Sequence, residues 1–553
     1  MNVHERAILF ALCLAGLAPH AHGQSLSDPE LQRRLAHQRE QAQASVKPAV
    51  DVLTGATDEQ TGSFALTQEV PCFRIQEIVW EGARGWDWLV TDSATMQGRC
   101  IGARGLRALQ DHLTRRLIAR GYITSRVLVP EQNLAAGRLA LQLVAGNIGK
   151  IRAEGASVGF ATLVLPAGPG DVLNQRDLDQ ALENIRRLYS QYPVEFDLLP
   201  GEVQGETDIV VKYPEGKRWR GVLTLDDSGT KATGRAQLGG ILLIDSPLYL
   251  HDALTLTLNR NANAGNGSRG TRSSSLHWSV PFGYWSILLG VSQTQYKQTV
   301  AGFSGDIVYA GRSHGAEVGI GWVPYRTATA RGALQVKFDR KVSRTFIDDT
   351  AIDVQYRNIV GYDVGFTHRQ SVDNGRLDLG IGFKGSMPGH SAAPGQIIGT
   401  PDWDGRFRLQ TFTVNLTLPF QANRQQFRYQ ANLRAQRATT PVPNAEFFSI
   451  GNRYTVRGFD GESTLAAEEG AVLRNDLAWL FGAHEVFVAL DTGRVGGPHA
   501  ASLAGKSMTG IACGLRGRID RFNYELTIGR PLSKPDGFDA RSSTMTAALG
   551  AEF

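Results

Sequence analysis

The chain has 553 residues, a net charge of +5 and an apolar fraction of 42%. This length favours more than one domain, and so small a net charge gives no indication of a nucleic-acid partner. Glycine is common, at 62 residues, against roughly 7% in average proteins, which is typical of a chain with many short strands and turns.

Residues 1–23 are predicted to form a secretory signal peptide. Arg6 supplies the basic start, and the apolar run Ala7–Leu17 that follows is too short to span a bilayer as a helix. Small residues at 21–23 offer a cleavage site before Gln24. A short buried helix is the alternative, which the flanking residues disfavour. We therefore expect the mature chain to lie outside the cytoplasm, and no later segment has the length and apolarity of a transmembrane helix.

Residues 24–45 are predicted to form a helix, which Ser27 and Glu30 start as a capping box. Its apolar face consists of Leu31 and Leu35 only. A helix that is polar nearly all round does not fit a dry core, so it needs solvent or a wet cavity. Residues 46–70 lack periodicity and are predicted to form a linker.

Two similar α+β modules are predicted to follow, at 71–146 and 147–214. Each has the order strand, helix, strand, strand, which indicates a structural duplication. In the first module we expect strands at 73–82, 125–132 and 137–146, and a helix at 103–120. In the second we expect strands at 148–156, 194–201 and 207–214, and a helix marked by Leu178, Leu182, Ile185 and Leu188. A free edge strand in such modules can pair with an extended guest peptide; the alternative is that they act only as spacers.

The cysteines indicate one disulfide bond. Cys72 and Cys100 lie in the first module, and an exported chain passes into an oxidising compartment. We therefore expect these two residues to be bonded. Cys13 belongs to the signal peptide, Cys513 has no evident partner, and the spacing does not match a zinc site.

Residues 215–553 are predicted to form a transmembrane β-barrel. Apolar residues alternate with polar or small ones in segments of about ten residues, which loops separate. One example runs through Phe412, Val414, Leu416, Leu418 and Phe420. At roughly 21 residues per strand and connection, the region accommodates about 16 strands. A large soluble β-sandwich is the alternative, which the export signal and the glycine content disfavour.

We find no catalytic, metal-binding or nucleotide-binding pattern. The HExxH, GxSxG and Walker motifs are missing from the sequence, and the histidines are scattered. The sequence therefore predicts a protein that is not an enzyme, has no cofactor and cannot drive work by nucleotide hydrolysis.

Several ordered segments resemble one family. They are "CFRIQEIVWEG", "RGYITSRVLVPEQNLAAGRLALQLVAG", "LDDSGTKATGRAQLGGILLIDSPLYLHDALTL", "YTVRGF", "RNDLAW", "LDTGRV" and "GRPL". Over residues 25–553 the chain is similar to the TpsB outer-membrane transporters of two-partner secretion (the FhaC/ShlB-like, hemolysin activator/secretion family). The resemblance implies two periplasmic POTRA domains, a barrel of 16 strands, and an N-terminal helix able to plug the pore.

The same resemblance implies a luminal ion pair. In the family, a loop folds back into the barrel, here around 450–465, and its tip carries the motif of Val456, Arg457, Gly458 and Phe459. The arginine pairs with an aspartate on the barrel wall, which corresponds to Asp491 and is followed by Gly493. Without the resemblance, Arg457 would be interpreted as an exposed residue of a surface loop. One departure from the family is Ala489, where an aromatic residue or glycine is usual, which leaves the local packing open.

The resemblance also implies the function. The POTRA domains would capture an unfolded partner exoprotein (TpsA-type) through its N-terminal secretion domain. The barrel would carry this partner across the outer membrane, and the transporter would be a monomer. The terminal Phe553 resembles the signal that the barrel-assembly machinery reads. An assembly factor that inserts other barrels is the alternative function, and a passive porin is a third, which two POTRA domains disfavour.

Overall fold

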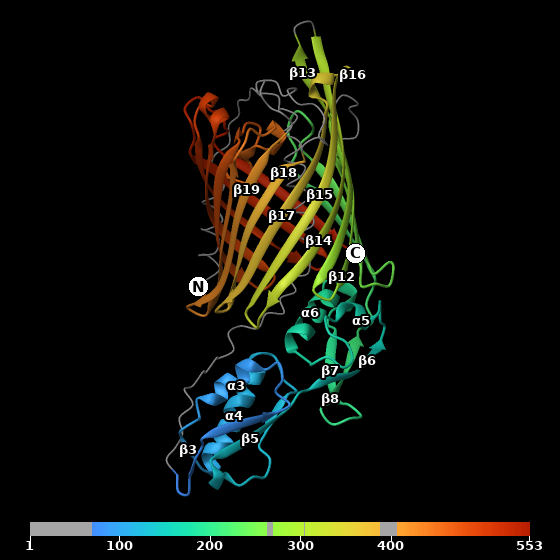
Figure 1. The fold of residues 1–553 in the computed structure, drawn as a ribbon. Helices are drawn as coiled ribbons and strands as arrows, with labels where there is room; N and C mark the ends of the chain where they lie inside the picture. Colours follow the sequence, from blue (N-terminus) through green and yellow to red (C-terminus); the bar gives the residue numbers. More distant parts are fainter. Residues whose placement is uncertain (1–68, 263–268, 303–304, 388–405) are drawn as a thin grey trace.

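The computed structural model describes residues 69–262, 269–302, 305–387 and 406–553. The predicted signal peptide, the predicted helix at 24–45 and most of the predicted linker lie outside these ranges. The described chain forms two small α+β modules followed by a closed β-barrel, with the second module next to the barrel (Figure 1).

The first module contains more elements than the sequence predicted. Its elements are β1 (Phe73–Arg74), β2 (Glu77–Glu81), α3 (Asp87–Ala94), β3 (Cys100–Ile101), α4 (Ala103–Ala119), β4 (Arg126–Leu128) and β5 (Arg138–Val144). The single strand expected at 73–82 was wrong: β1 pairs with β3, while β2 belongs to a separate sheet of order β2-β5-β4. The chain changes sheet at Ile75, which is fully buried. Helix α3 was missed because its sequence has no clear apolar face.

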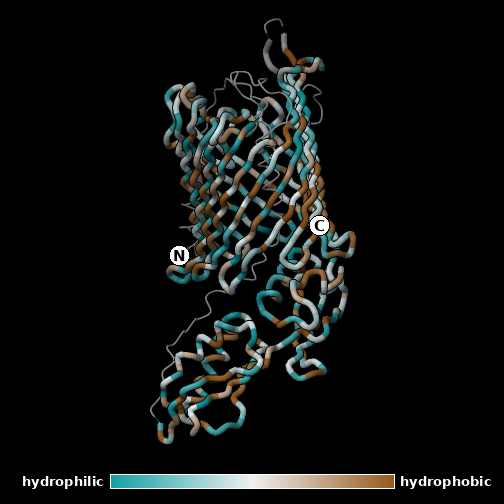
Figure 2. Tube along the Cα trace, viewed as in Figure 1, coloured by the Kyte–Doolittle hydropathy of each residue, from teal (hydrophilic) through white to brown (hydrophobic). Residues whose placement is uncertain are grey.

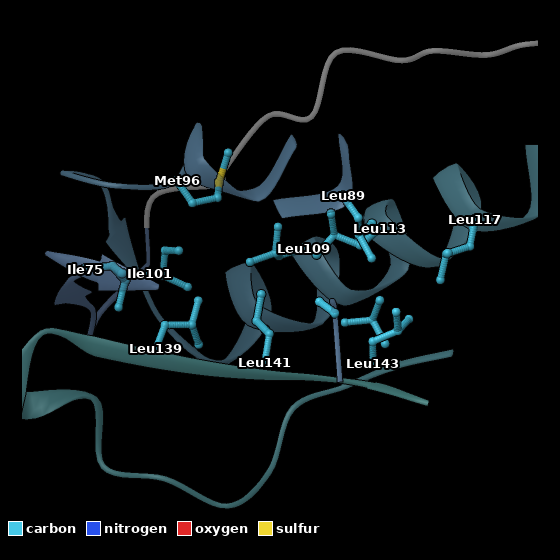
Figure 3. Close-up of a cluster of buried hydrophobic side chains, with 12 residues drawn as sticks. Ile75, Leu89, Met96, Ile101, Leu109, Leu113, Leu117, Leu139, Leu141 and Leu143 are labelled. Carbon is cyan, nitrogen blue, oxygen red and sulfur yellow. The ribbon is translucent and has the colours of Figure 1, made fainter. Parts of the chain in front are cut away.

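Helix α4 packs on strand β5 to form the core of the first module (Figure 3). The apolar residues of α4 recur every four positions, and those of β5 every two, so that each element has one apolar face. The facing residues are Leu109, Leu113, Leu117, Leu139, Leu141 and Leu143. Burying one leucine side chain contributes about 1.5–3 kcal/mol, so this interface stabilises the module despite its small size.

The second module repeats the plan with β6 (Asn147–Gly155), α5 (Ala161–Val164), α6 (Gln175–Arg186), β7 (Glu195–Pro200) and β8 (Glu206–Tyr213). Its sheet has the order β6-β8-β7, in which β6 and β8 are parallel. Asn174 caps α6 by accepting a hydrogen bond from the N–H of Arg176. The short helix α5 was missed, and Leu188, expected within the helix, lies just beyond α6 but is fully buried.

Sixteen antiparallel strands of the described chain close the barrel, apart from the two-residue β16 (Thr350–Ala351), which pairs with β15 only. They are β9 (Trp219–Asp226), β10 (Gln237–Asp245), β11 (Ala253–Asn261), β12 (Gly270–Phe282), β13 (Trp285–Gly302), β14 (Gly305–Arg326), β15 (Ala330–Ile347), β17 (Arg357–Val372), β18 (Gly375–Ser386), β19 (Arg408–Ala422), β20 (Gln425–Ala438), β23 (Glu469–Phe481), β24 (His484–Gly496), β25 (Ser507–Ile519), β26 (Phe522–Ser533) and β27 (Thr544–Glu552). Strand β27 pairs with β9 to complete the ring. The expected strand number is thus confirmed.

Hydrophobic and hydrophilic residues alternate along the barrel strands (Figure 2). Because successive side chains of a strand point to opposite faces, the alternation gives the barrel an apolar outer face. In β13, every second residue from Trp285 to Val291 is an exposed large apolar residue. Trp285 stacks on Trp322 of β14, with 5.3 Å between ring centroids, close to the turn beside the second module. Aromatic residues at such a position form the belt that meets the membrane interface.

Strands β13, β14 and β15 are longer than the segments of about ten residues that the alternation predicted. They contain 18, 22 and 18 residues, and Figure 1 shows them extending beyond the rim opposite the modules. Over the part of the chain that the structure describes, no helix is both long and apolar enough to cross a membrane.

Candidate functional site: a loop inside the barrel

The connection between β20 and β23 folds back into the barrel lumen. It contains the hairpin of β21 (Phe448–Ile450) and β22 (Leu465–Ala467), and its apolar side chains pack against the inner wall. Val456 is fully buried, Phe459 is 3% exposed, and both belong to one cluster with Val472, Val495 and Met508 of the wall. The loop is thus held inside the lumen by an apolar cluster that it shares with the barrel wall.

Arg457 at the tip of this loop is bonded to Asp491 of β24. Its Nε donates to Oδ2 at 2.7 Å and its Nη2 to Oδ1 at 2.7 Å. The backbone N–H of Arg457 donates a third hydrogen bond to Oδ2 at 3.0 Å. Asp491 is fully buried. A bidentate pair with charge on both partners fixes position and orientation together, so the loop tip is held in one place.

Asp476 of β23 is a second carboxylate on Arg457, which the sequence analysis missed. Its Oδ1 lies 2.5 Å from Arg457 Nη2, and its Oδ2 lies 3.5 Å from Arg516 Nη1. The available signal was the segment "RNDLAW", in which Arg474 and Asp476 occupy alternate positions of a membrane strand. Charges at such positions face the lumen rather than lipid.

Three wall glycines allow the loop to come close, Gly510 and Gly529 to its backbone and Gly493 to its side chains. A Cβ at Gly510 of β25 would lie 1.9 Å from the carbonyl oxygen of Arg457. A Cβ at Gly493 would lie 3.0 Å from Ile450 Cγ2, and one at Gly529 would lie 2.9 Å from the nitrogen of Gly458. Gly510 is paired directly with Asp491. Gly493 was predicted from its motif, whereas Gly510 and Gly529 were not, because only the barrel register brings these glycines together.

Gly458 is required by the conformation of the tip. Its φ is +97°, and a Cβ there would lie 2.4 Å from the carbonyl oxygen of Arg530. Such a φ is easily adopted by glycine and disfavoured for other residues. The next residue, Phe459, meets Phe538 edge-on, with 6.2 Å between centroids.

The structure also shows what occupies the space beside Ala489. This residue is buried in a small cluster with Phe487, whose ring lies 5.8 Å from the Arg457 guanidinium carbon and 4.5 Å from that of Arg516. An aromatic residue therefore lies near the ion pair, but four positions before Asp491 rather than two. A cation over an aromatic face is a favourable contact.

Three further ion pairs tie the loop to the chain on both sides of the β9–β27 junction. Arg453 Nη1 lies 2.9 Å from Asp227 Oδ1, and Glu462 Oε1 lies 3.7 Å from Arg235 Nε, both on the β9 side. On the β27 side, Asp460 Oδ2 lies 3.2 Å from Arg541 Nε. Next to the loop, a luminal cavity of about 600 Å³ is lined largely by polar residues, Arg457 and Asp476 among them.

At the other end of the barrel, the second module is joined by buried polar contacts. Arg187 Nη2 donates to the carbonyl oxygen of His251 at 2.6 Å and to that of Ser279 at 2.9 Å. Asn184 Nδ2 donates to the carbonyl oxygen of Gly283 at 2.8 Å. Burial lowers the pKa of Arg187 to about 10 and that of His251 to about 4. Side chains of the module are therefore bonded to backbone carbonyl groups at the turns and strand ends of the barrel.

Cys72 and Cys100 are joined by a disulfide bond, with 5.4 Å between their Cα atoms. Cys513 lies in β25 and is not part of a disulfide.

Phe553 follows β27 and exchanges backbone hydrogen bonds with Gly221 of β9 at 2.9 and 3.2 Å. In the described ranges, no group of three His, Cys, Asp or Glu residues is arranged to hold a metal ion.

A closed barrel with an apolar outer face, whose mouth carries two α+β modules, has the architecture of an outer-membrane protein with periplasmic POTRA domains. Three family models match the chain. Residues 73–146 match "POTRA domain, ShlB-type", 147–200 match "POTRA domain", and 205–517 match "Haemolysin secretion/activation protein ShlB/FhaC/HecB". The chain belongs to this ShlB/FhaC/HecB family. The modules are hereafter POTRA 1 and POTRA 2.

Curated relatives are named as transporters. Outer membrane transporter CdiB-2 of Burkholderia pseudomallei is 33% identical over 84% of this chain and 80% of its own. Hemolysin transporter protein ShlB of Serratia marcescens is 26% identical over 84% of this chain and 83% of its own. The solved structure of CdiB from Escherichia coli matches 96% of this chain and all of its own, with a TM-score of 0.84 and 26% identity. The predicted POTRA domains, barrel, family and outer-membrane location are confirmed, whereas the predicted plug helix lies outside the described residues.

Proposed function

We propose that this protein secretes one dedicated partner exoprotein of the hemolysin, hemagglutinin or adhesin type. POTRA 1 and POTRA 2 recognise the N-terminal secretion domain of the partner in the periplasm. The barrel then conducts the unfolded chain to the cell surface, and the transporter works as a monomer. The observation that carries the proposal is the Arg457 loop, which is bonded inside a lumen whose periplasmic mouth bears two POTRA domains. A wide pore with a fastened internal loop suits regulated passage of a polypeptide better than free diffusion.

The names of the relatives support this class of cargo. CdiB-2, ShlB and HpmB are named as transporters, the last two as hemolysin transporters. The edge strands of the two POTRA sheets, β2 and β4 in one and β6 and β7 in the other, offer backbone groups that an extended segment can pair with.

We assign a role to each segment of the chain, including those outside the described ranges. Residues 1–23 are removed as a signal peptide, 24–45 form a helix that plugs the lumen, and 46–70 link it to POTRA 1 at 71–146. POTRA 2 covers 147–214 and the barrel 215–553. Phe553 acts during insertion by the barrel-assembly machinery, and the Arg457–Asp491 pair holds the loop closed until cargo arrives.

The test compares cells of the native host with and without this gene. Mass spectrometry of the medium is expected to show the loss of one large exoprotein, with outer-membrane barrels at normal levels. Expression of the full-length chain restores that exoprotein. A broad loss of barrel proteins from the outer membrane would instead identify an assembly factor, and the secretion proposal would have to be abandoned.

We further propose that transport needs no nucleotide hydrolysis, because folding of the partner outside prevents it from sliding back. The full chain, reconstituted in liposomes without ATP, is expected to translocate the purified partner. Partner variants that cannot fold are expected to emerge more slowly. Their emergence at the normal rate would contradict this source of directionality.

A further inference from the structure

Four large apolar side chains are exposed where POTRA 2 meets the barrel. Phe160 is 68% exposed, Leu248 60%, Tyr249 55% and Trp219 50%. We call these four residues the rim patch. Monomeric soluble surfaces rarely gather residues of this size, and where they do, the patch marks an interaction.

The rim patch comes from three segments, two of which are in direct contact. Gly159 of POTRA 2 forms an antiparallel bridge with Leu250 in the β10–β11 turn, which places Phe160 opposite Tyr249. Ser246 Oγ of the same turn donates to the carbonyl oxygen of Val158 at 2.6 Å. The segment of POTRA 2 that carries Phe160 is thus attached to the barrel turn that carries Leu248 and Tyr249.

The rim patch continues the lipid-facing surface of the barrel. Trp219 begins β9 and lies on the same face as Leu223 and Leu225, which are 52% and 45% exposed. Phe553 pairs with Gly221, so its side chain lies on this face too. Arg218, the neighbour of Trp219, lies over the Tyr249 ring, so the start of β9 lies beside the turn that contacts POTRA 2.

Two cations border the patch. Lys217 Nζ lies 3.3 Å from the centroid of the Trp219 ring. The guanidinium carbon of Arg218 lies 4.3 Å from the centroid of the Tyr249 ring. The only acidic residue in the segment from Pro214 to Arg220 is Glu215. Aromatic rings beside basic residues are the combination that suits the boundary between acyl chains and phosphate groups.

We infer that the rim patch is a phospholipid-binding surface, which seats POTRA 2 in the headgroup layer of the inner leaflet beside the β9–β27 junction. Phe160, Leu248, Tyr249 and Trp219 enter the acyl boundary, and Lys217 meets the phosphates. The inference rests on the outer-membrane location and the geometry above, and not on the identity of any secreted partner.

The test uses the full-length protein in nanodiscs of phosphatidylethanolamine and phosphatidylglycerol. A fluorescent probe is attached to Phe160→Cys in a Cys513→Ser background, and quenching by phospholipids with a nitroxide near the headgroup is measured. The matched control is Val203→Cys, since Val203 is 62% exposed on the same domain. It lies in the turn before β8, at the end of the sheet opposite to Tyr213, which contacts the barrel.

Quenching at position 160 is expected to be several-fold stronger than at position 203. As a second measurement without a probe, a photoactivatable phosphatidylglycerol is expected to label the segments around Phe160 and Tyr249. Lys217→Gln is expected to reduce this labelling. Equal quenching at both positions together with no labelling would overturn the inference. So would protection of position 160 that appears only when a secreted partner is added, because the occupant would then be a polypeptide.

Discussion

Arg457 is held by two carboxylates, of which Asp491 is fully buried and Asp476 lines the luminal cavity. Burying charges costs several kcal/mol each unless strong, well-aligned partners replace water. Here Asp491 accepts three hydrogen bonds from Arg457, while Asp476 lies between Arg457 and Arg516. The arrangement is directional, so a small displacement of the tip breaks several bonds together. A contact of this kind suits a loop with two positions rather than one that drifts.

Replacing Asp491 by asparagine is expected to release the loop tip. The change keeps the shape but removes the charge that compensates Arg457, and loss of one partner of a buried pair costs about 3–5 kcal/mol. Single-channel recordings are expected to show more frequent opening, and secretion to fall about tenfold or more. The matched control is Asp378→Asn, since Asp378 also lines the lumen but pairs with Arg369 and Arg376. Equal effects of both variants would contradict a specific role for Asp491.

Gly510→Ala tests the close approach of the loop backbone. The new Cβ would lie 1.9 Å from the carbonyl oxygen of Arg457, so the tip has to move away from Asp491. Barrel stability is expected to be retained. Labelling of a cysteine introduced at the tip, by a reagent added from outside, is expected to increase. Gly221→Ala is the control, because a Cβ there has no neighbour within 4 Å. Unchanged labelling in Gly510→Ala would show that the tip does not depend on this contact.

At the scale of single elements, helix α4 is capped from outside its own segment. Gly102 at its N-terminus has no side chain to cap it. Instead, the carboxylate of Glu69 accepts hydrogen bonds from the N–H groups of Gly102, Arg104 and Gly105 at 2.8, 2.9 and 2.8 Å. Together with the nearby disulfide at Cys72, this contact fixes the beginning of POTRA 1 to the first turn of α4.

Glu69→Gln is expected to loosen this anchor. Hydrogen bonds from Gly105, Arg104 and Gly102 lower the pKa of Glu69, so the cap is present above the ordinary pKa and is lost as the pH falls through the lowered value. Hydrogen exchange of the 102–105 amides is expected to accelerate in the variant. Glu131→Gln, another exposed residue of POTRA 1, serves as control. Exchange that is equally fast in wild type would show that the cap does not form.

At the scale of the whole molecule, the joint between POTRA 2 and the barrel decides how motion passes between them. Glu183 binds Arg326 at 2.6 Å and also Arg331, and the Asp177 carboxylate accepts a hydrogen bond from Tyr284 at 2.7 Å. These contacts join α6 to the turns and strand ends of the barrel. POTRA 2 and the barrel rim therefore form one continuous packed unit, so a load applied to POTRA 2 reaches the barrel strands directly.

This joint is expected to weaken in acid through His251. Burial and the nearby Arg187 lower the pKa of His251 to about 4, against about 6.5 for a free imidazole. Between these pH values His251 binds a proton when POTRA 2 is separated from the barrel but not when it is docked. The free energy that favours docking therefore decreases as the pH falls. Spin-label distances between Val203 and the barrel turn at Asn423 are expected to broaden below about pH 6. His251→Gln is expected to make this broadening of the distances at low pH smaller. A pH profile identical to that of the wild type would show that His251 does not contribute to the weakening.

The sequence determined the architecture because the signals for it are local. Alternation with period two gives each strand one apolar and one polar face. Together with the export signal and the glycine content it favoured a barrel with one face toward lipid, and the length of the region gave its strand number. Leucines every four residues likewise predicted α4 and its buried face. Where no such period exists, as in α3 and α5, prediction failed, because packing against neighbouring elements holds those segments in place.

The luminal site divides in the same way. Arg457, Gly458 and Asp491 were found because they belong to motifs, each contained in a short segment. Asp476, Gly510, Gly529 and Phe487 were not found, because their roles depend on the register of four strands around the loop. Likewise, the rim patch unites Phe160 and Trp219, which are 59 residues apart. Periodicity fixes which way a side chain points, but only closure of the barrel and docking of POTRA 2 decide what it meets.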